Sequence, residues 1–274
     1  PWIYSHIDIL PRIRQVRYPV RDLKDRYFLT VYERAEIQID HAPDVVVTAS
    51  VTEADWLQKT RAKARKGGVF YIPMAYQGDP VLTSRSSPPD LRLVHLGSLE
   101  TTANRAGLAA YLEKAHERVM GALREAGVSC ELWIVGEAGR VKPSLRGLLE
   151  RSNAVLAGYV PELESILRPY DIAILPYEFD TGFRTKLPLF FKYHQAVVAA
   201  RQAVAGMNLD GLEQVCILVD SLDDFPQAIA ALARDEAGRT RLAHKAADFY
   251  RKHFRFEAVL PRYRNVLESL LPNE

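Results

Sequence analysis

The chain has 274 residues, of which 48% are apolar and 26% are charged, the composition of a soluble globular protein with a sizeable core. Its 36 basic and 34 acidic side chains leave a formal charge of +2, which gives no argument for a nucleic-acid partner, and we expect none. Both cysteines stand in apolar runs and no apolar run approaches the ~20 residues of a membrane-spanning helix, so we expect a cytoplasmic protein without a disulfide framework.

The first 80 residues are irregular and contain too few strands for a complete doubly wound domain. Their apolar runs and helical patterns predict a strand at 2–9, a helix at 20–40, a strand at 44–50, a helix at 52–66 and a strand at 68–73. Residues 76–90 are rich in Pro, Gly and Ser, which is typical of a linker. We therefore expect an incomplete N-terminal α/β domain.

From residue 91 onward, short apolar runs alternate with longer helical patterns. The runs are bounded by Gly, Pro or Asp and are mostly apolar throughout, which is typical of strands covered on both faces. Strands separated by helices predict right-handed crossovers and a doubly wound, Rossmann-like parallel sheet. The predicted strands are residues 91–96, 130–135, 154–158, 171–175, 196–200 and 215–219.

Helix signals lie between and after these strands. Apolar residues at three- and four-residue steps over 108–123 predict one long helix. Ser221 and Asp224 have the spacing of a capping box at the start of a further helix. Helical spacing predicts two C-terminal helices, over 238–254 and 256–271, and we expect their aromatic side chains to pack in the core.

Glycine-containing loops follow three of the predicted strands. In open parallel sheets, ligands bind beyond the carboxyl ends of the strands, where glycines let a ligand approach the backbone closely. These loops begin with Gly97-Ser98, Gly136-Glu137 and Gly158-Tyr159.

Two cations follow the fourth predicted strand of this region. Arg184 and Lys186 stand at the start of a helix predicted over 186–193. Two cations that point toward one place would make a diphosphate site. The alternative is that both are solvated loop charges, which is the commoner fate of Arg and Lys. Their place after a buried strand favours diphosphate binding.

Motifs of several other protein classes are absent. The sequence contains no GxxxxGK[ST], no GxGxxG and no GxSxG, which argues against a P-loop NTPase, a dinucleotide oxidoreductase and an α/β-hydrolase. The seven histidines form no HExxH motif and no cluster with the cysteines, so we expect no metal site and no cofactor.

The order of these features resembles the donor-binding domain of GT-B glycosyltransferases of retaining family four, the glycosyl transferases group 1. The resemblance covers residues 91–270, and its most specific part is the G-x-R-x-K element at 182–186. The other stretches that carry it are HLGSL (95–99), LWIVGEAG (132–139), NAVLAGYVPELESILRPYDIAILPY (153–177), FDTGFRTKLPLFFKYHQAVVAARQAVAGM (179–207) and DSLDDFPQAIAAL (220–232).

The resemblance implies a division of the chain into three parts. Residues 1–80 would be a partial acceptor-side α/β domain, residues 81–254 the nucleotide-sugar-binding domain, and residues 255–274 a helix that crosses back to the N-terminal domain. In such enzymes the nucleotide-sugar is a substrate, so no cofactor is implied.

The resemblance also assigns roles to individual residues. Arg184 and Lys186 would neutralise the diphosphate of the donor, in place of a divalent metal. His6 would match a histidine that faces the sugar; the alternative is a hydrogen-bonded histidine at a strand end. The implied donor-binding residues are Gly97, Ser98, Gly136, Glu137, Tyr159, Val160, Thr181, Gly182 and Phe183, with Tyr159 and Val160 against the base.

The sequence departs from the family pattern at two acidic positions. Many relatives carry two glutamates eight positions apart, one facing the sugar and one holding the ribose, and Thr181 and Leu189 stand there in this chain. Leu189 cannot accept a hydrogen bond from a ribose. Asp180 or Glu178 could supply a carboxylate near the sugar. The relatives' glycine before the next strand is replaced by His194.

Together these features predict a retaining, metal-independent glycosyltransferase. It would move a sugar from a nucleotide-diphosphate donor to a saccharide or lipid-linked acceptor, in surface polysaccharide or glycolipid synthesis. The alternative is a catalytically degenerate binding or scaffold module, which the two lost carboxylates favour. A sugar-nucleotide epimerase is disfavoured because few acids and histidines are placed to serve it. A basic run over 59–66 leaves peripheral contact with the inner membrane open, against a solvated helix end.

Overall fold

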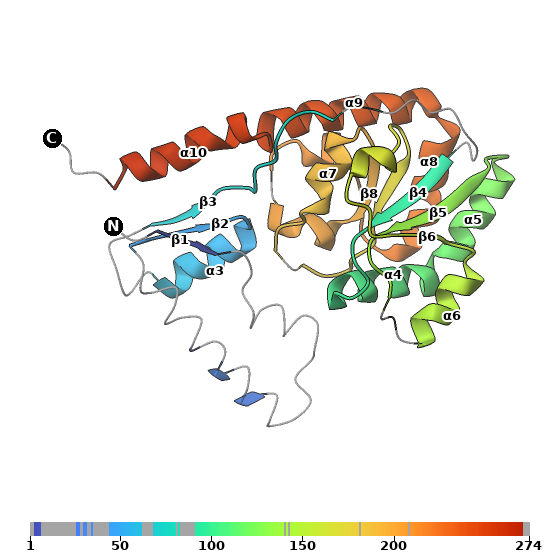
Figure 1. Cartoon of the computed structure of the whole chain (residues 1–274), viewed down its shortest axis with the longest axis horizontal. Helices are drawn as coiled ribbons and strands as arrows, with labels where there is room; N and C mark the ends of the chain where they lie inside the picture. Colours follow the sequence, from blue (N-terminus) through green and yellow to red (C-terminus); the bar gives the residue numbers. More distant parts are fainter. Residues whose placement is uncertain are drawn as a thin grey trace.

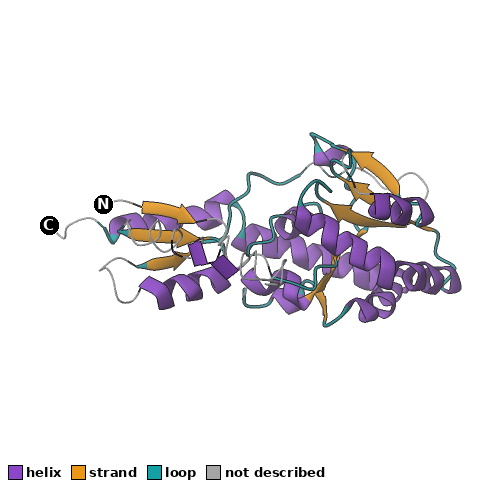
Figure 2. Cartoon of the chain, turned by 90° about the horizontal axis from the view of Figure 1, so that it is seen from below, coloured by secondary structure: helices purple, strands orange, loops and turns teal. Residues whose placement is uncertain are grey.

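The chain folds into a small lobe and a large lobe, which Figure 2 shows side by side. A computed structural model describes residues 3–6, 26–27, 30–31, 34, 44–61, 68–80, 82, 91–139, 141, 143–180, 182–207 and 209–270.

The large lobe is built around a six-stranded parallel sheet with the strand order β6-β5-β4-β7-β8-β9. Its strands are β4 (Leu91–Leu96), β5 (Cys130–Val135), β6 (Val155–Gly158), β7 (Ile172–Leu175), β8 (Ala196–Ala200) and β9 (Ile217–Val219). Every residue of β7 and β8 is buried, as expected for strands covered on both faces. The sheet confirms the doubly wound fold that the sequence predicts.

Helices cover both faces of this sheet. The helices α4 (Thr102–Lys114), α5 (His116–Glu125), α6 (Pro143–Arg151) and α8 (Phe225–Arg234) contact one another on one face. The helices α7 (Lys186–Lys192) and α9 (Glu236–His253) pack together on the other. Short 3₁₀ turns complete the lobe: η1 (Leu163–Ser165), η2 (Arg201–Met207), η3 (Leu212–Gln214) and η4 (Leu222–Asp224).

In the large lobe, the bounds of the predicted strands differ from those of the structure by two residues at most. The predicted bounds of β4, β5 and β8 are correct at both ends. The last strand begins at Ile217 and not at residue 215, because Val215 ends the η3 turn. Val215 and Cys216 are nevertheless buried in the core, which is why the sequence pattern included them.

The long helix predicted over 108–123 is two helices. The backbone leaves helical geometry at Ala115, with φ −121° and ψ −34°, between α4 and α5. The apolar stripe from Leu108 to Leu123 is buried as predicted, so the break does not change which face points to the core. Helix α6 is not among the predicted elements, because only Leu145 and Leu149 form its buried face.

The capping box predicted at Ser221 is present. The Asp223 amide donates to the Ser221 hydroxyl at 3.2 Å, and the Ser221 amide donates to the Asp224 carboxylate at 3.0 Å. These bonds satisfy amide groups at a helix start that have no partner within the helix. The box opens the short turn η4, and α8 follows directly from it.

The small lobe contains a three-stranded parallel sheet in the order β1-β2-β3, formed by β1 (Ile3–His6), β2 (Val45–Thr48) and β3 (Val69–Tyr71). Helix α3 (Val51–Arg61) follows β2, and the last helix, α10 (Phe256–Glu268), lies over the sheet (Figure 1). Val259 and Val266 of α10 share a small core with Val45, Val47 and Ile72. The helix predicted over 20–40 and the end of the one predicted over 52–66 lie largely outside the described residues.

We expect the same substitution at two helical glycines to have opposite effects. A Cβ at Gly121 in α5 meets only the end of the Arg124 side chain at 4.0 Å, so Gly121→Ala should raise the free energy of unfolding by about 0.5–1 kcal/mol. A Cβ at Gly107 in α4 would lie 2.4 Å from the buried Tyr177 ring, so Gly107→Ala should lower it by about 1–3 kcal/mol. Urea denaturation of both variants tests this, and equal effects would contradict the packing described here.

Candidate functional site

The strand order locates a candidate site between β4 and β7. From β4 the following strands, β5 and β6, are added toward one edge of the sheet, whereas from β7 the strands β8 and β9 are added toward the other edge. Ligands of open α/β sheets bind in the crevice at such a switch point. The strands lead into Gly97 and Pro176 respectively, and the helices that follow begin at Thr102 and Lys186. Side chains from the two halves of the sheet therefore meet here.

Two glycines bring the loops after β4 and β5 into contact. Gly97 and Gly136 have φ values of 136° and 137°, which favour glycine. A Cβ on Gly136 would lie 2.5 Å from the Gly97 carbonyl carbon, so no larger residue fits there without a backbone shift. The Leu99 amide donates to the Glu137 carbonyl at 2.7 Å and ties the loops together. The predicted donor-binding residues Gly97, Ser98, Gly136 and Glu137 are thus neighbours.

The two predicted cations lie against one buried aromatic ring. The Arg184 guanidinium carbon is 4.3 Å from the centroid of Tyr177, and the Lys186 ammonium is 5.3 Å from it. Arg184 is only 5% exposed and Lys186 is half-buried. The alternative of two solvated loop charges is therefore wrong.

Arg184 is held by backbone oxygens. Its Nε donates to the Ala203 carbonyl at 2.9 Å, and one terminal nitrogen donates to the Phe179 carbonyl at 3.0 Å. These bonds offset the cost of burying a guanidinium. They also fix the loop between β7 and α7 against η2.

Lys186 contacts residues from both sides of the switch point. Its ammonium donates to the side-chain oxygen of Asn104 on α4 and lies 3.4 Å from the Tyr177 hydroxyl. A Cβ on Gly97 would come within 2.8 Å of that ammonium, so the glycine makes room for it. The lysine thus lies directly beside the loop that follows β4.

His95 and Tyr177 form a neutral pair that completes a cluster with Arg184, Lys186 and Asn104. His95 Nε2 and the Tyr177 hydroxyl are 3.0 Å apart, and both side chains are fully buried. Burial, with the nearby Lys186 charge, lowers the pKa of His95 to about 3, and burial raises the pKa of Tyr177 to about 12 against the opposing effect of Arg184. Both groups are neutral at pH 7, so they add no charge to that of the two cations.

Three residues of this cluster, His95, Asn104 and Tyr177, are not among the predicted site residues. His95 is a fully buried polar residue near the end of a mostly apolar strand and directly precedes Leu96 and Gly97, which is the signal that could have identified it. Asn104 and Tyr177 have no such local signal, because the fold alone brings them together.

The small lobe touches the same loop. Thr52 donates to the Asp180 carboxylate at 2.9 Å, and the Tyr76 hydroxyl donates to the Thr185 carbonyl at 2.8 Å. A Cβ on Gly206 would lie 2.7 Å from both the Gly182 carbonyl oxygen and the Ser50 hydroxyl. The segment that carries both cations therefore contacts both η2 and the small lobe.

The two acidic residues proposed as substitutes for a missing carboxylate are engaged elsewhere. The Asp180 carboxylate accepts from Thr52 and from the Gly182 amide, the latter at 2.9 Å. Glu178 pairs with Lys114 at 3.2 Å and accepts from the Leu222 amide at 3.3 Å. Both carboxylates thus bind structural partners.

The remaining predicted residues lie farther out. Tyr159 follows β6 and is 76% exposed, whereas the neighbouring Val160 packs against the core. The Phe183 ring is 6.1 Å from that of Phe254, at the end of α9. His6 ends β1, but its side chain lies outside what the structure describes, as does the whole of Thr181.

The two other departures from the family pattern have clear structural settings. Leu189 lies in α7, half-buried against the core of the large lobe, so it offers an apolar surface where a carboxylate was expected. His194 has φ 53°, a left-handed conformation that favours glycine and that histidine adopts more readily than most residues. The turn before β8 thus keeps the shape that a glycine would give it.

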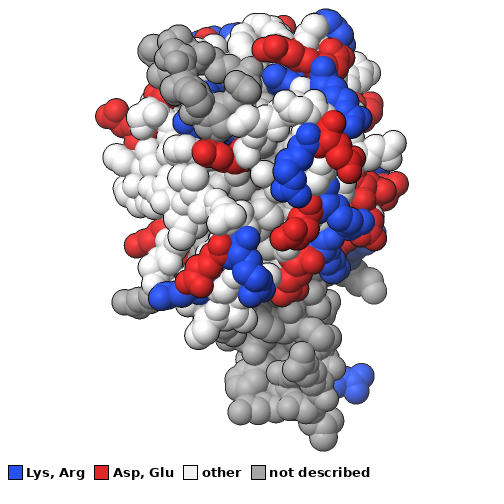
Figure 3. Space-filling model, turned by 90° about the vertical axis from the view of Figure 1, so that its right-hand side faces the viewer, with Lys and Arg blue, Asp and Glu red and all other residues white. Residues whose placement is uncertain are grey.

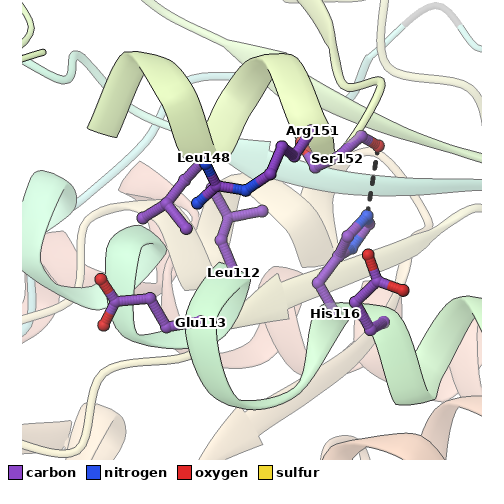
Figure 4. A pocket seen from close by; sticks show the side chains of 7 residues that line it. Leu112, Glu113, His116, Leu148, Arg151 and Ser152 are labelled. Carbon is purple, nitrogen blue, oxygen red and sulfur yellow. Dashed lines mark hydrogen bonds between the residues drawn. The ribbon is translucent and has the colours of Figure 1, made fainter. Parts of the chain in front are cut away.

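A pocket of about 280 Å³ opens elsewhere, between α4, α5 and α6. Figure 4 shows its lining, including the His116 ring, which points to the Ser152 carbonyl 3.3 Å away. Glu113 and Glu117 line this pocket together with Arg151, so it does not favour an anionic ligand. Figure 3 shows acidic and basic side chains intermingled on one face of the molecule, without a large patch of one sign.

Two features are absent from the residues that the structure describes. No three His, Cys, Asp or Glu side chains converge as metal ligands would. Within the same residues, no helix combines the length and the apolar character that crossing a bilayer requires.

Comparison with known proteins points to one family. The sequence model of the glycosyl transferases group 1 matches residues 90–235. No curated protein matches the chain. Similar solved structures include HepE of Anabaena in complex with UDP-glucose, which is 14% identical with a TM-score of 0.72 over 98% of this chain and 72% of HepE. Sucrose-phosphate synthase of Thermosynechococcus elongatus is 18% identical with a TM-score of 0.71 over 98% and 67%.

TarM is also similar, with 14% identity and a TM-score of 0.66 over 86% of this chain. The chain spans under half the length of TarM, since the match covers 46% of it. At such low sequence identities the similarity shows only the fold. This is the GT-B fold that the sequence predicts.

The buried His95 should make the stability of the protein depend on pH. Its pKa is near 3 in the folded state and about 6.5 in the unfolded chain, so the unfolded state takes up the proton first as the pH falls below 6.5. The contribution of His95 to the free energy of unfolding is therefore fully present above pH 6.5. It declines below that pH, by about 2 kcal/mol between pH 7 and pH 5. His95→Gln removes this titration, and urea denaturation at both pH values should show a correspondingly weaker dependence. An unchanged dependence would contradict a neutral, buried His95.

Proposed function

The chain belongs to the glycosyl transferases group 1 family, and we propose that it transfers a sugar from a nucleotide-diphosphate donor to a hydroxyl acceptor with retention of anomeric configuration. The observation that carries this proposal is the placement of Arg184 and Lys186 on one buried ring at the switch point of the sheet. Such a place suits the diphosphate of a nucleotide-sugar.

The chemistry requires stabilisation of a leaving group. The bond between the anomeric carbon and the diphosphate oxygen breaks, the acceptor oxygen bonds to that carbon on the same face, and the acceptor proton passes to the departing phosphate. Negative charge develops on the phosphate oxygens during this step. Lys186 and Arg184 would stabilise it, and preorganised electrostatic stabilisation is commonly the largest contribution to catalysis.

The cluster is preorganised for such a role. Arg184 is fixed by two carbonyls, and Lys186 by Asn104 and Tyr177, before any ligand binds. In this proposal the two side-chain cations neutralise the diphosphate as a divalent metal does in other glycosyltransferases. His95 and Tyr177 remain neutral, so they do not offset the positive charge.

Uridine nucleotides are the first donors to test. HepE was solved with UDP and glucose and with UDP-glucose, and the pneumococcal O-GlcNAc transferase GtfA with UDP and GlcNAc. Tyr159, exposed beside β6, would present its ring to the base of the bound nucleotide. For the acceptor we keep a saccharide or a lipid-linked saccharide of surface polysaccharide or glycolipid synthesis, with peripheral membrane contact through the basic run at 59–66.

One observation favours a second candidate function. Arg184 is almost fully buried with its donors on backbone carbonyls, and Leu189 replaces a carboxylate that relatives use. A chain that kept the fold but lost turnover would have these features, and it would serve as a binding or scaffold module.

Charge removal at Lys186 separates the two candidates. Lys186→Ala should lower the rate of sugar transfer, or of donor hydrolysis, by about 10²–10³-fold, because a preorganised contact to the leaving phosphate is lost. Arg184→Ala should lower it similarly, with an additional loss of stability because two carbonyls lose their donor. The measurement is a radiolabelled transfer assay with UDP-glucose and UDP-GlcNAc, each also tested for raising the melting temperature.

Lys192→Ala is the matched control. Lys192 lies in the last turn of the same helix and donates to the Gln77 carbonyl, so its removal changes the net charge equally but leaves the cluster intact. A rate for Lys186→Ala equal to that of Lys192→Ala would refute the diphosphate assignment. Donor binding by the parent protein without any turnover would favour the scaffold module.

A further inference from the structure

We propose that Asn104 is a positioning residue for Lys186: its side-chain oxygen fixes the ammonium beside Gly97 without neutralising it. The inference rests on the proposed function, in which Lys186 binds the donor diphosphate. Asn104 lies in the first turns of α4 and is buried.

Two donors converge on the Asn104 side-chain oxygen. The Lys186 ammonium, at the start of α7, donates to this oxygen. The hydroxyl of Tyr177, which follows β7, also donates to it, over a distance of 3.3 Å. The nitrogen of the same amide donates to the Ser98 carbonyl at 2.8 Å. One amide thus links the loop after β4, the segment after β7 and the start of α7.

The surrounding backbone leaves space for this amide and this ammonium together. A Cβ on Gly97 would lie 2.6 Å from the Asn104 nitrogen and 2.8 Å from the Lys186 ammonium. The glycine is therefore required for both side chains to occupy these places. The orientation of the amide follows from its partners, because the oxygen must face two donors and the nitrogen a carbonyl.

The choice of an amide has an electrostatic consequence. A carboxylate of the same shape would hold the ammonium more strongly, but it would cancel the charge that a diphosphate needs. Asn104 and Tyr177 both offer neutral oxygens to Lys186. The two contacts that fix the ammonium thus place no negative charge beside it.

A double-mutant cycle tests this role. Isothermal titration with UDP compares the parent protein, Asn104→Ala, Lys186→Ala and the double variant. We expect Asn104→Ala to weaken UDP binding by about tenfold. If Asn104 acts through Lys186, the same substitution has almost no further effect in the Lys186→Ala background. A merely structural residue would weaken binding equally in both backgrounds.

Asn104→Asp gives an independent readout of charge. It should weaken UDP binding by about tenfold or more and leave the binding of uncharged uridine unchanged, because only the diphosphate senses the cancelled charge. Asn153→Asp is the matched control, since Asn153 lies exposed in the turn before β6 and receives the same added charge. Asn153→Asp should bind UDP as the parent does.

The outcomes separate two failures. If the parent and Lys186→Ala bind UDP equally, or neither binds it, the diphosphate site is wrong and this inference fails with it. If Lys186→Ala weakens UDP binding while Asn104→Ala does not, or if the two effects simply add, only the positioning role of Asn104 is overturned. Equal losses of UDP and uridine binding in Asn104→Asp would also overturn it.

Discussion

Two cations lie against one buried aromatic ring at the switch point of the large sheet, and the candidate site depends on this contact. A cation over a desolvated tyrosine gains about 2 kcal/mol, which is too little by itself to offset the burial of a guanidinium. Hydrogen bonds from Arg184 to two backbone carbonyls also offset this cost, and the side-chain oxygen of Asn104 does the same for Lys186. Two like charges beside one ring repel each other, so this arrangement favours the binding of an anion.

The fold supplies the place for this contact. Tyr177 follows β7 and His95 is the last residue but one of β4, so the neutral pair joins the two halves of the sheet at the switch point. Gly97 and Gly136 let the adjacent loops approach until a Cβ would collide with backbone. The small lobe then reaches the same loop through Thr52 and through the Tyr76 hydroxyl.

Sequence patterns predicted the sheet and part of the candidate site. Strands such as Leu91–Leu96 were predictable because a buried parallel strand is a bounded apolar run, and the cations were predictable from their spacing after such a strand. The burial of Arg184 was not, since its partners are backbone carbonyls brought near by folding. Asn104 lies 82 positions from Lys186, and no local pattern relates residues at that separation.

A crystal structure of the protein with UDP bound is the most direct test of the account. It should show a phosphate oxygen about 3 Å from the Lys186 ammonium, over the loop that begins at Gly97. A diphosphate located instead in the pocket between α4 and α6, with Lys186 contacting only protein, would contradict the central claim.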